Sequence, residues 1–281
     1  MTGTALQGSE WQGRVGDAWA REWKRTDRSF ADLTHQLNAA ILAVAPDAGR
    51  AIDLGCGAGE TSIALAKARP GLKVTGVDLS EDLVAVATER GAGIANLTFR
   101  LGDTAALKPA TAANLFLSRH GVMFFPDPVA AFTSIRRAAA PGAPLVFSCF
   151  AERARNAWVQ VLDDAAEQAP PAAAGYVPGP FGFADRDLTA GILADAGWTG
   201  AAASPVDFTY VAGAGDNPVP DAISFFTHIG PVARLLADAA PDRRLVLMDR
   251  LAKVLAAHES GGQIKFAAAA WIWTARAGEA A

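Results

Sequence analysis

The 281-residue chain has two cysteines and no long apolar run, and these absences exclude several classes of protein. Cys56 lies between two glycines and Cys149 lies within an apolar run, which is a poor pattern for a disulfide framework. No apolar run reaches the roughly 18 residues that a membrane-spanning helix needs. The N-terminus lacks the basic start and the apolar stretch of a signal peptide. We therefore expect a reduced, cytoplasmic protein with no membrane span.

Basic clusters and metal-ligating clusters are scarce as well. The net charge is −4, and the longest basic runs are the pairs Arg136-Arg137 and Arg243-Arg244. An enzyme of nucleic acids usually has a basic face, so we expect no nucleic-acid partner. No group of cysteines and histidines has metal-ligand spacing, so we expect no metal. With 51% hydrophobic and 19% charged residues, the composition indicates a globular protein.

Short apolar runs alternate with helix-forming segments along the first half of the chain. The strand-like runs cover residues 50–54, 72–78, 97–101, 114–118 and 143–150, and the helical segments cover residues 60–69, 80–91 and 128–140. This alternation predicts an α/β fold with a doubly wound, mostly parallel sheet and right-handed crossovers. Further strands over residues 202–211 and 264–276 bring the expected sheet to seven.

The remaining segments suggest helical additions to this core. We predict an N-terminal helical cap over residues 1–46, the ligand-binding core over 47–150, and an insertion over 151–184. Residues 185–281 then complete the core, with a helical lid inserted at about 217–259.

The strongest signal is the segment AIDLGCGAGETS, residues 51–62, where a strand meets a helix. Gly55, Gly57 and Gly59 allow the backbone to turn sharply and to approach a ligand without a Cβ in the way. In such sheets, ligands bind beyond the carboxyl ends of the strands. A glycine-rich loop alone also fits a dinucleotide site or a plain tight turn.

Three acidic residues make a dinucleotide a less suitable ligand for this loop. Glu60 stands where a dinucleotide fingerprint needs its third glycine. Asp53 just before the loop suits an ammonium or another cation better than a pyrophosphate. Asp78 ends the second strand, where its two oxygens can accept from both hydroxyls of a ribose.

These residues, with VTGVDLS, LGDTAAL and APGAPLVFSCF, resemble the class I S-adenosylmethionine (SAM)-dependent methyltransferases over residues 47–150. That resemblance implies a Rossmann-like methyltransferase fold that binds SAM and releases S-adenosylhomocysteine. The segments around SRHGVMFFPDPVAAF, PGPFGFAD and FTHIGP are similar to a bacterial small-molecule subgroup related to the ubiquinone and menaquinone methyltransferases. The start of the fourth strand departs from the family, because Asn114 replaces its usual aspartate.

The resemblance also implies roles for individual residues. The cofactor-binding residues it implies are Asp53, Gly55, Cys56, Gly57 and Gly59 for the methionine part, Asp78 and Leu79 for the ribose and adenine, Gly102, Asp103 and Thr104 for the adenine amino group, and Ser118 at the site's edge. Simpler interpretations remain open for two of them: Asp103 as a helix cap and Asp78 as a strand terminus. The place of Cys56 in the glycine loop accounts for this residue, so we do not expect it to act as a nucleophile.

The acceptor wall is expected just after the fourth strand. His120 is a candidate general base for a phenol or enol proton, and Arg119 is a candidate partner for an anion. Both residue types are also common as solvated or capping groups in loops. Met123 and Phe124 face either the acceptor or the core.

Two more distant side chains are further candidates for substrate binding. Trp19 lies one helical turn from Trp23, which suits either shielding of a sulfonium or ordinary packing of the cap. His228 faces either the acceptor or solvent.

The sequence therefore predicts an enzyme that transfers a methyl group from SAM to oxygen or carbon of a small molecule, aromatic or isoprenoid-like. Methyl transfer from a sulfonium needs alignment and exclusion of water more than it needs a particular base. A SAM-binding protein without catalysis, such as a sensor, is the alternative. An NAD-dependent oxidoreductase is disfavoured by Glu60 and by the lack of a Tyr-x-x-x-Lys pair. A homodimer is left open.

Overall fold

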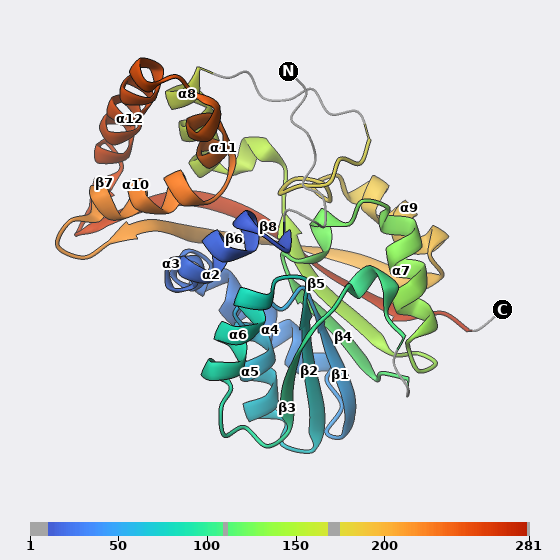
Figure 1. The fold of residues 1–281 in the computed structure, drawn as a ribbon. Helices are drawn as coiled ribbons and strands as arrows, with labels where there is room; N and C mark the ends of the chain where they lie inside the picture. The colour runs from blue at the N-terminus through green and yellow to red at the C-terminus, as the bar shows by residue number, and fades with distance from the viewer. Residues whose placement is uncertain (1–10, 109–111, 168–174, 280–281) are drawn as a thin grey trace.

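The computed structural model describes residues 11–108, 112–167 and 175–279, and it is built around one large sheet (Figure 1). The strand order is β3-β2-β1-β4-β5-β8-β6, and the short β7 pairs with β8. The strands are β1 (Gly49–Leu54), β2 (Leu72–Asp78), β3 (Leu97–Leu101), β4 (Leu115–Arg119), β5 (Pro144–Phe150), β6 (Trp198–Ala214), β7 (Glu259–Ser260) and β8 (Gln263–Ala277). The mostly parallel, doubly wound sheet predicted from the sequence is thus confirmed, with β7 as an addition that the sequence did not indicate.

The chain winds in both directions from β1, which places helices on both faces of the sheet. From β1 the chain passes through α5 (Glu60–Ala68) to β2 and through α6 (Glu81–Arg90) to β3. It then returns to β4 and passes through α7 (Pro128–Arg137) to β5 in the opposite direction. Because parallel crossovers are right-handed, this reversal puts α5 and α6 on one face and α7 on the other. The last four residues of β1 are therefore all buried.

Polar side chains cap the starts of two helices. The Ser80 hydroxyl accepts a hydrogen bond from the backbone N–H of Leu83 at the start of α6. The Asp185 carboxylate accepts from two backbone N–H groups at the start of α9 (Arg186–Asp195). Each side chain satisfies N–H groups that the first helical turn leaves without partners.

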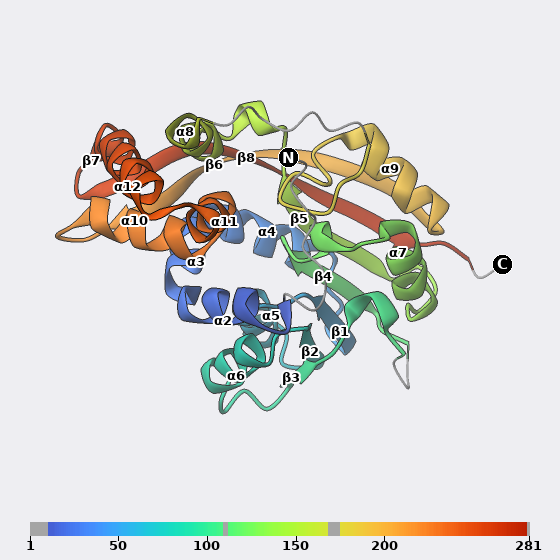
Figure 2. The same ribbon diagram turned by 45° about the horizontal axis from the view of Figure 1, so that its top comes forward.

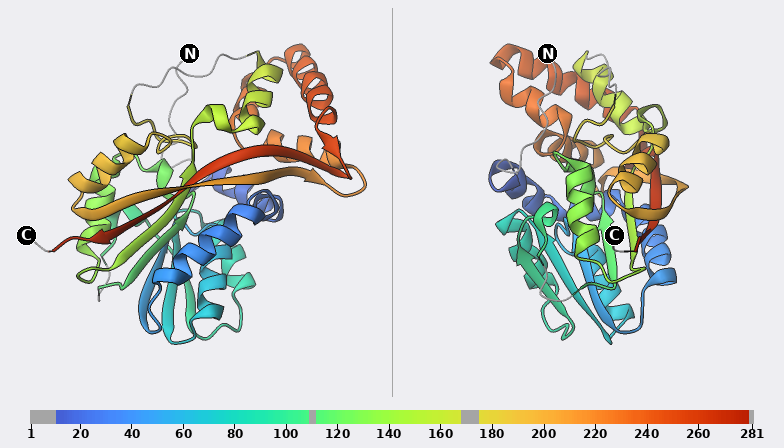
Figure 3. Two further views of the ribbon diagram at one scale, coloured as in Figure 1. Left: turned by 180° about the vertical axis from the view of Figure 1, so that it is seen from behind. Right: turned by 90° about the vertical axis from the view of Figure 1, so that its right-hand side faces the viewer.

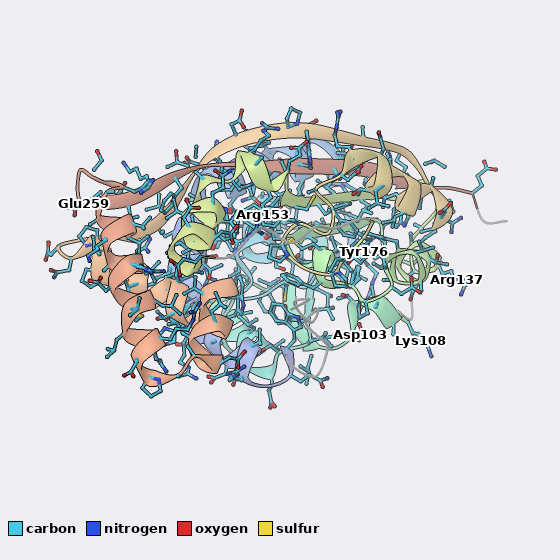
Figure 4. All side chains as sticks on the ribbon, turned by 90° about the horizontal axis from the view of Figure 1, so that it is seen from above. Asp103, Lys108, Arg137, Arg153, Tyr176 and Glu259 are labelled. Atoms are coloured by element: carbon cyan, nitrogen blue, oxygen red, sulfur yellow. The ribbon has the colours of Figure 1, made fainter. Side chains whose placement is uncertain are left out.

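The antiparallel pair β6–β8 is longer than the rest of the sheet and continues past it as a ribbon (Figures 1 and 3). β8 pairs with β5 only from Ala270 to Arg276, whereas its pairing with β6 continues to Gln263. Viewed from above, Glu259 at the far end of the ribbon and Arg137 at the end of α7 lie at opposite ends of the molecule (Figure 4).

Helices from three parts of the chain gather around the ribbon (Figure 2). They are α3 (Trp23–Ser29) and α4 (Ala31–Val44) before β1, α8 (Ala157–Ala166) after β5, and α10 (Pro218–His228), α11 (Pro231–Asp238) and α12 (Pro241–Ala256) between β6 and β7. The first helix, α2 (Arg14–Arg21), packs against α6 instead. Ion pairs join the first group to the last, because Arg25 and Arg28 on α3 contact the Asp221 carboxylate on α10 at 2.6 and 2.7 Å. The predicted division of the chain into cap, core, insertion and lid stays a prediction.

No helix within the described ranges is both long and apolar enough to cross a membrane. The same residues hold no cluster of three or more His, Cys, Asp or Glu side chains arranged to bind a metal ion.

Asn156 stabilises the point where the ribbon leaves the sheet. Its side-chain amide donates to the carbonyl oxygens of Ala151, Glu152 and Ala269, and its Oδ1 accepts from the N–H of Ala269. The buried amide thus continues the hydrogen bonding of β8 where β5 ends.

We expect Asn156→Ala to lower the free energy of unfolding by about 2–4 kcal/mol, because several buried backbone groups lose their partners. Urea unfolding followed by circular dichroism measures the change. Gln160→Ala is the matched control, since this exposed amide also bonds a carbonyl, that of Ala154. Equal effects of the two substitutions would contradict the role given to Asn156.

Candidate functional site

A cavity of about 250 Å³ lies at the carboxyl ends of the parallel strands. The direction of winding reverses here between β1 and β4, which is where sheets of this kind bind ligands. One part of the wall comes from the end of β2, the start of α6 and the loops after β1, β2 and β3: Gly55, Cys56, Gly57, Ala58, Asp78, Leu79, Leu83, Asp103, Thr104 and Ala105. Another part comes from β5, β6, α8, α10 and the segment after it: Phe150, Trp158, Tyr210, Phe225, Phe226, Ile229 and Gly230.

The glycine loop lines the cavity partly with backbone that carries no side chains. Gly55 and Gly57 have φ angles of +63° and +53°, which glycine adopts at low cost. A Cβ on Gly55 would lie 3.1 Å from the Cα of Gly121, so the loops after β1 and β4 meet here. A Cβ on Gly57 would meet no protein atom within 4 Å, so the space beside this residue is open to a ligand.

Asp78 is the central acceptor of this part of the cavity. Its Oδ2 accepts from the backbone N–H of Gly57 at 2.8 Å, and its Oδ1 accepts from that of Ser80 at 3.0 Å. A carboxylate has about four lone-pair sites, so two remain for a ligand. Two adjacent hydroxyls, such as those of a ribose, match this remaining capacity. Leu79 lines the cavity beside it.

Asp103 and Thr104 line the cavity from the loop after β3. The Oδ1 of Asp103 accepts from the backbone N–H of Ala105 at 2.8 Å and so caps the short helix η1 (Thr104–Ala106). The cap interpretation is therefore correct, and it leaves the second carboxylate oxygen available for a ligand amino group. The open cradle at Gly57, the hydroxyl-pair acceptor at Asp78 and this exposed carboxylate together fit an adenosyl ligand.

Asp53, Gly59, Gly102 and Ser118 do not appear in the cavity wall. Asp53 is fully buried, and burial raises its pKa to about 7 although Ser62 donates to its Oδ2. Its Oδ1 has no partner within the described ranges. Ser118 donates to the carbonyl of Leu54 at 2.6 Å and accepts from the N–H of Gly121, so it joins the ends of β1 and β4. The ligand contacts predicted for these residues stay predictions.

Cys56 lines the cavity but is a poor nucleophile. Burial, with Asp78 and Asp53 nearby, raises the pKa of its thiol well above the usual value. The thiolate form is thereby disfavoured.

Arg119 lies at the end of β4, between the two parts of the cavity wall. Its guanidinium donates to Asp27 Oδ1 at 2.6 Å and to Thr34 Oγ1 at 2.9 Å. Asp27 also pairs with Arg90 at 2.8 Å. Arg119 therefore uses its guanidinium mainly for contacts with the N-terminal helices α3 and α4.

His120 follows Arg119 and is buried among aromatic rings. The centroid of its ring lies 4.8 Å from that of Phe30 and 4.5 Å from that of Phe150. Its Nδ1 lies 2.9 Å from Ser148 Oγ, and its Nε2 has no partner in the described structure. Burial, and to a lesser degree the charge of Arg119, lowers the pKa of His120 to about 3. A base with so low a pKa is inefficient at neutral pH, which disfavours the predicted general-base role.

Aromatic rings form a connected shell in the part of the wall contributed by β5, β6, α8 and α10. Trp158 stacks on Tyr210 at 5.3 Å between ring centroids, and Tyr210 stacks on Phe226 at 6.5 Å. Phe150 contacts Trp158 at 5.2 Å, and Phe30 contacts Tyr210 at 5.7 Å. This acceptor chamber, defined as Phe30, Phe150, Trp158, Tyr210, Phe225 and Phe226, suits a flat apolar molecule.

Of the other predicted substrate residues, some line the cavity and one does not. Trp19, Met123 and Phe124 line the cavity. His228 does not, because its Nδ1 lies 2.7 Å from the carbonyl of Ser224 and 3.2 Å from Glu22 Oε1 at the surface. Its neighbours on α10, Phe225 and Phe226, line the cavity instead.

Sequence reasoning missed most of the acceptor chamber. Trp158 lies in the predicted insertion and Tyr210 in a predicted strand, with no motif around either. The Phe225-Phe226 pair was the available signal, since only Thr227 separates it from His228. Gly121 was also missed, although a Cβ there would lie 2.6 Å from the carbonyl of Leu54.

The buried His120 predicts a specific pH dependence of stability. The pKa of His120 is 6.5 in the unfolded chain and lower in the native protein. As the pH falls below 6.5, the unfolded chain therefore binds a proton that the native histidine does not bind. Native stability from this residue is present above pH 6.5 and is lost toward its folded pKa of about 3. As the pH falls from 6.5 toward that value, we expect wild type to lose up to about 1.4 kcal/mol of stability per pH unit relative to His120→Asn.

Urea unfolding of both proteins between pH 7.5 and about pH 5 measures this difference. Asn tolerates the positive φ of position 120, +59°, which limits backbone effects of the substitution. Asp53 titrates alike in both proteins and cancels in the comparison. Parallel stability curves would show that His120 is not held neutral.

Comparisons with known proteins agree with this geometry. Residues 46–174 match the family model described as "Methyltransferase domain". The trans-aconitate 2-methyltransferase of Rhizobium meliloti is 36% identical over 107 residues, which are 37% of this chain and 40% of the relative. The match thus spans about two fifths of that relative's length.

Solved structures show the same fold at low identity. The YcgJ protein of Bacillus subtilis is 16% identical, with a TM-score of 0.54 over 88% of this chain and 99% of the other. The phosphoethanolamine N-methyltransferase 2 of Haemonchus contortus, solved with S-adenosyl-L-methionine, is 16% identical, with a TM-score of 0.56 over 98% of this chain and 61% of the other.

The quinone-related subgroup gains no support from these relatives and stays a prediction. The broader assignment rests on the family match, the strand order and the loop geometry together. Residues 46–174 thus match a methyltransferase domain, and this match supports the class I SAM-dependent methyltransferase family that the glycine loop and the strand-end acids predicted.

Proposed function

We propose that this protein transfers a methyl group from SAM to a small, flat, apolar acceptor. The observation that carries the proposal is the continuity of the cavity, which joins the glycine loop and Asp78 to the acceptor chamber. When bound, SAM supplies an electrophilic methyl group on a sulfonium centre.

The residues of the β1–β3 loops would hold the cofactor. Asp78 would accept from the ribose hydroxyls, Asp103 from the adenine amino group, and Leu79 would pack beside the adenine. The orphaned Oδ1 of Asp53 would attract the ammonium of the methionine part, directly or through water. Trp19 and Phe124 would exclude water from the sulfonium.

The acceptor would lie among the rings of the acceptor chamber. Two of these rings, Phe150 and Tyr210, belong to β5 and β6, which lie on the far side of β4 from the loops that would hold the cofactor. An acceptor stacked there would face the methyl group across the segment that carries Arg119, His120 and Gly121. Alignment of this kind accounts for most of what an enzyme must supply to a sulfonium donor.

The charge of the wall argues against a polycarboxylate such as the substrate in the name of the Rhizobium relative. Among the described lining residues, Arg119 is the one cation of Lys or Arg type, and it pairs with Asp27. Asp27, Asp78 and Asp103 also line the cavity, so acidic groups outnumber it. A tricarboxylate would meet more like charge than opposite charge.

A SAM-binding protein without catalysis is the second candidate. It is favoured by one observation: His120, the histidine that contacts the rings of the acceptor chamber, is held neutral and is unsuited to act as a base. Methyl transfer to an already ionised or strongly nucleophilic acceptor needs no such base, so the catalytic proposal stands.

SAM and S-adenosylhomocysteine should each raise the melting temperature, and NAD should not. Asp78→Asn should weaken binding of S-adenosylhomocysteine by about 100-fold, because a charged acceptor of two hydroxyl hydrogen bonds is lost. Isothermal titration calorimetry measures the affinity. Asp82→Asn, at an exposed site on α6, is the matched control and should bind like wild type. Equal affinity of both variants for S-adenosylhomocysteine would contradict the binding role given to Asp78.

Phe226→Ala should weaken the acceptor by about ten- to hundredfold while leaving the affinity for S-adenosylhomocysteine within about twofold. Radiolabelled SAM with a panel of phenols, quinols and trans-aconitate identifies the acceptor and gives its KM. Phe266→Ala removes a buried phenylalanine of the ribbon that does not line the cavity and serves as control. Methylation of trans-aconitate alone would contradict the proposed acceptor class.

A further inference from the structure

The cavity wall contains buried polar atoms without protein partners. Within the described ranges these include His120 Nε2, Trp158 Nε1 and Thr26 Oγ1, each on a residue that lines the cavity. Buried polar atoms are nearly always hydrogen-bonded, so such a group points to a ligand that completes the bonding.

Ser148 is the hydrogen-bond partner of His120 Nδ1. Ser148 is fully buried in β5, and the partner of its hydroxyl in the described structure is His120 Nδ1 at 2.9 Å. The backbone reinforces the pair, because the N–H of His120 donates to the carbonyl of Ser148 at 3.1 Å.

The buried hydroxyl needs an acceptor for its own proton, and the lone pair on Nδ1 is the one that the described structure offers. If Nδ1 instead carried the hydrogen, the hydroxyl proton of Ser148 would be buried without a partner. A neutral ring with an unprotonated Nδ1 carries its proton on Nε2.

We propose that Ser148 holds His120 as the neutral Nε2–H tautomer, and that this N–H donates a hydrogen bond to a carbonyl or phenolate-type oxygen of the acceptor. The ligand class implied is an aromatic molecule with a hydrogen-bond-accepting oxygen. The second part rests on the proposed function, whereas the tautomer is a property of the protein alone.

Trp158 supports the same ligand class. Its indole N–H is a second buried donor without a partner in the described structure, and both Trp158 and His120 contact the ring of Phe150. Two unpaired donors and six aromatic rings around one chamber match a flat ligand with oxygens at its edge better than a pure hydrocarbon. In this arrangement Ser148 is a positioning residue, because it acts through His120.

The tautomer is measured by ¹⁵N NMR on protein labelled at its four histidines, without any substrate. The signals that disappear in His120→Asn identify His120. We expect an unprotonated Nδ1 and a protonated Nε2 in wild type, and a mixture of tautomers or the opposite one in Ser148→Ala. His35, His228 and His258 are internal controls and should be unchanged. An Nδ1–H tautomer or an imidazolium in wild type at pH 7 overturns the proposal.

The ligand class is tested with 4-hydroxyacetophenone as probe and ethylbenzene as its oxygen-free counterpart, both in the presence of S-adenosylhomocysteine. We expect the oxygenated probe to bind at least about tenfold more tightly, to shift the Nε2 signal, and to lose this advantage in His120→Asn. Equal binding of the two probes, or binding of neither, overturns the ligand class. Failure of S-adenosylhomocysteine itself to bind overturns the proposed function and leaves the tautomer result standing.

Discussion

The site depends on hydrogen bonds that tie together the carboxyl ends of three neighbouring strands. Asp78 at the end of β2 accepts from the backbone of Gly57 in the loop after β1. Ser118 at the end of β4 donates to the carbonyl of Leu54 in β1. These bonds fix the glycine loop relative to both neighbouring strands, and the loops after β1 and β4 then approach too closely for a side chain at Gly55. A cradle held in this way binds without first being ordered.

The same strand ends divide the cavity into a polar part and an aromatic part. The β1–β3 loops contribute backbone and carboxylates, whereas β5, the ribbon and the helices around it contribute rings. The N-terminal helices complete the enclosure, since Arg25 and Arg28 contact Asp221 on α10 and Arg119 contacts Asp27. In the proposed function, donor recognition is thus built into the sheet, and acceptor recognition into elements added around it. This division explains why proteins of one fold accept different molecules.

The sequence predicted the sheet well because its signals are local. Apolar runs and the loop around Gly57 each depend on neighbouring residues, and the structure places these elements as expected. The cofactor loops follow the same logic, since each predicted residue stands beside a strand end. The strand β7 was missed because two residues carry no periodic signal.

The acceptor chamber was not predictable in the same way. Trp158, Tyr210 and Phe226 come from distant segments and meet only because α8 and α10 pack against the ribbon. The neutral state of His120 likewise depends on burial between Phe30 and Phe150, which no local pattern reports. Its role therefore changes from the predicted base to a proposed donor.

A crystal structure with S-adenosylhomocysteine bound is the most direct test of the central claim, that one cavity serves donor and acceptor. The account predicts ribose hydroxyls within hydrogen-bonding distance of the Asp78 carboxylate and the homocysteine sulfur facing the rings around Phe150. A ligand bound elsewhere, or one whose sulfur faces away from the acceptor chamber, would contradict it.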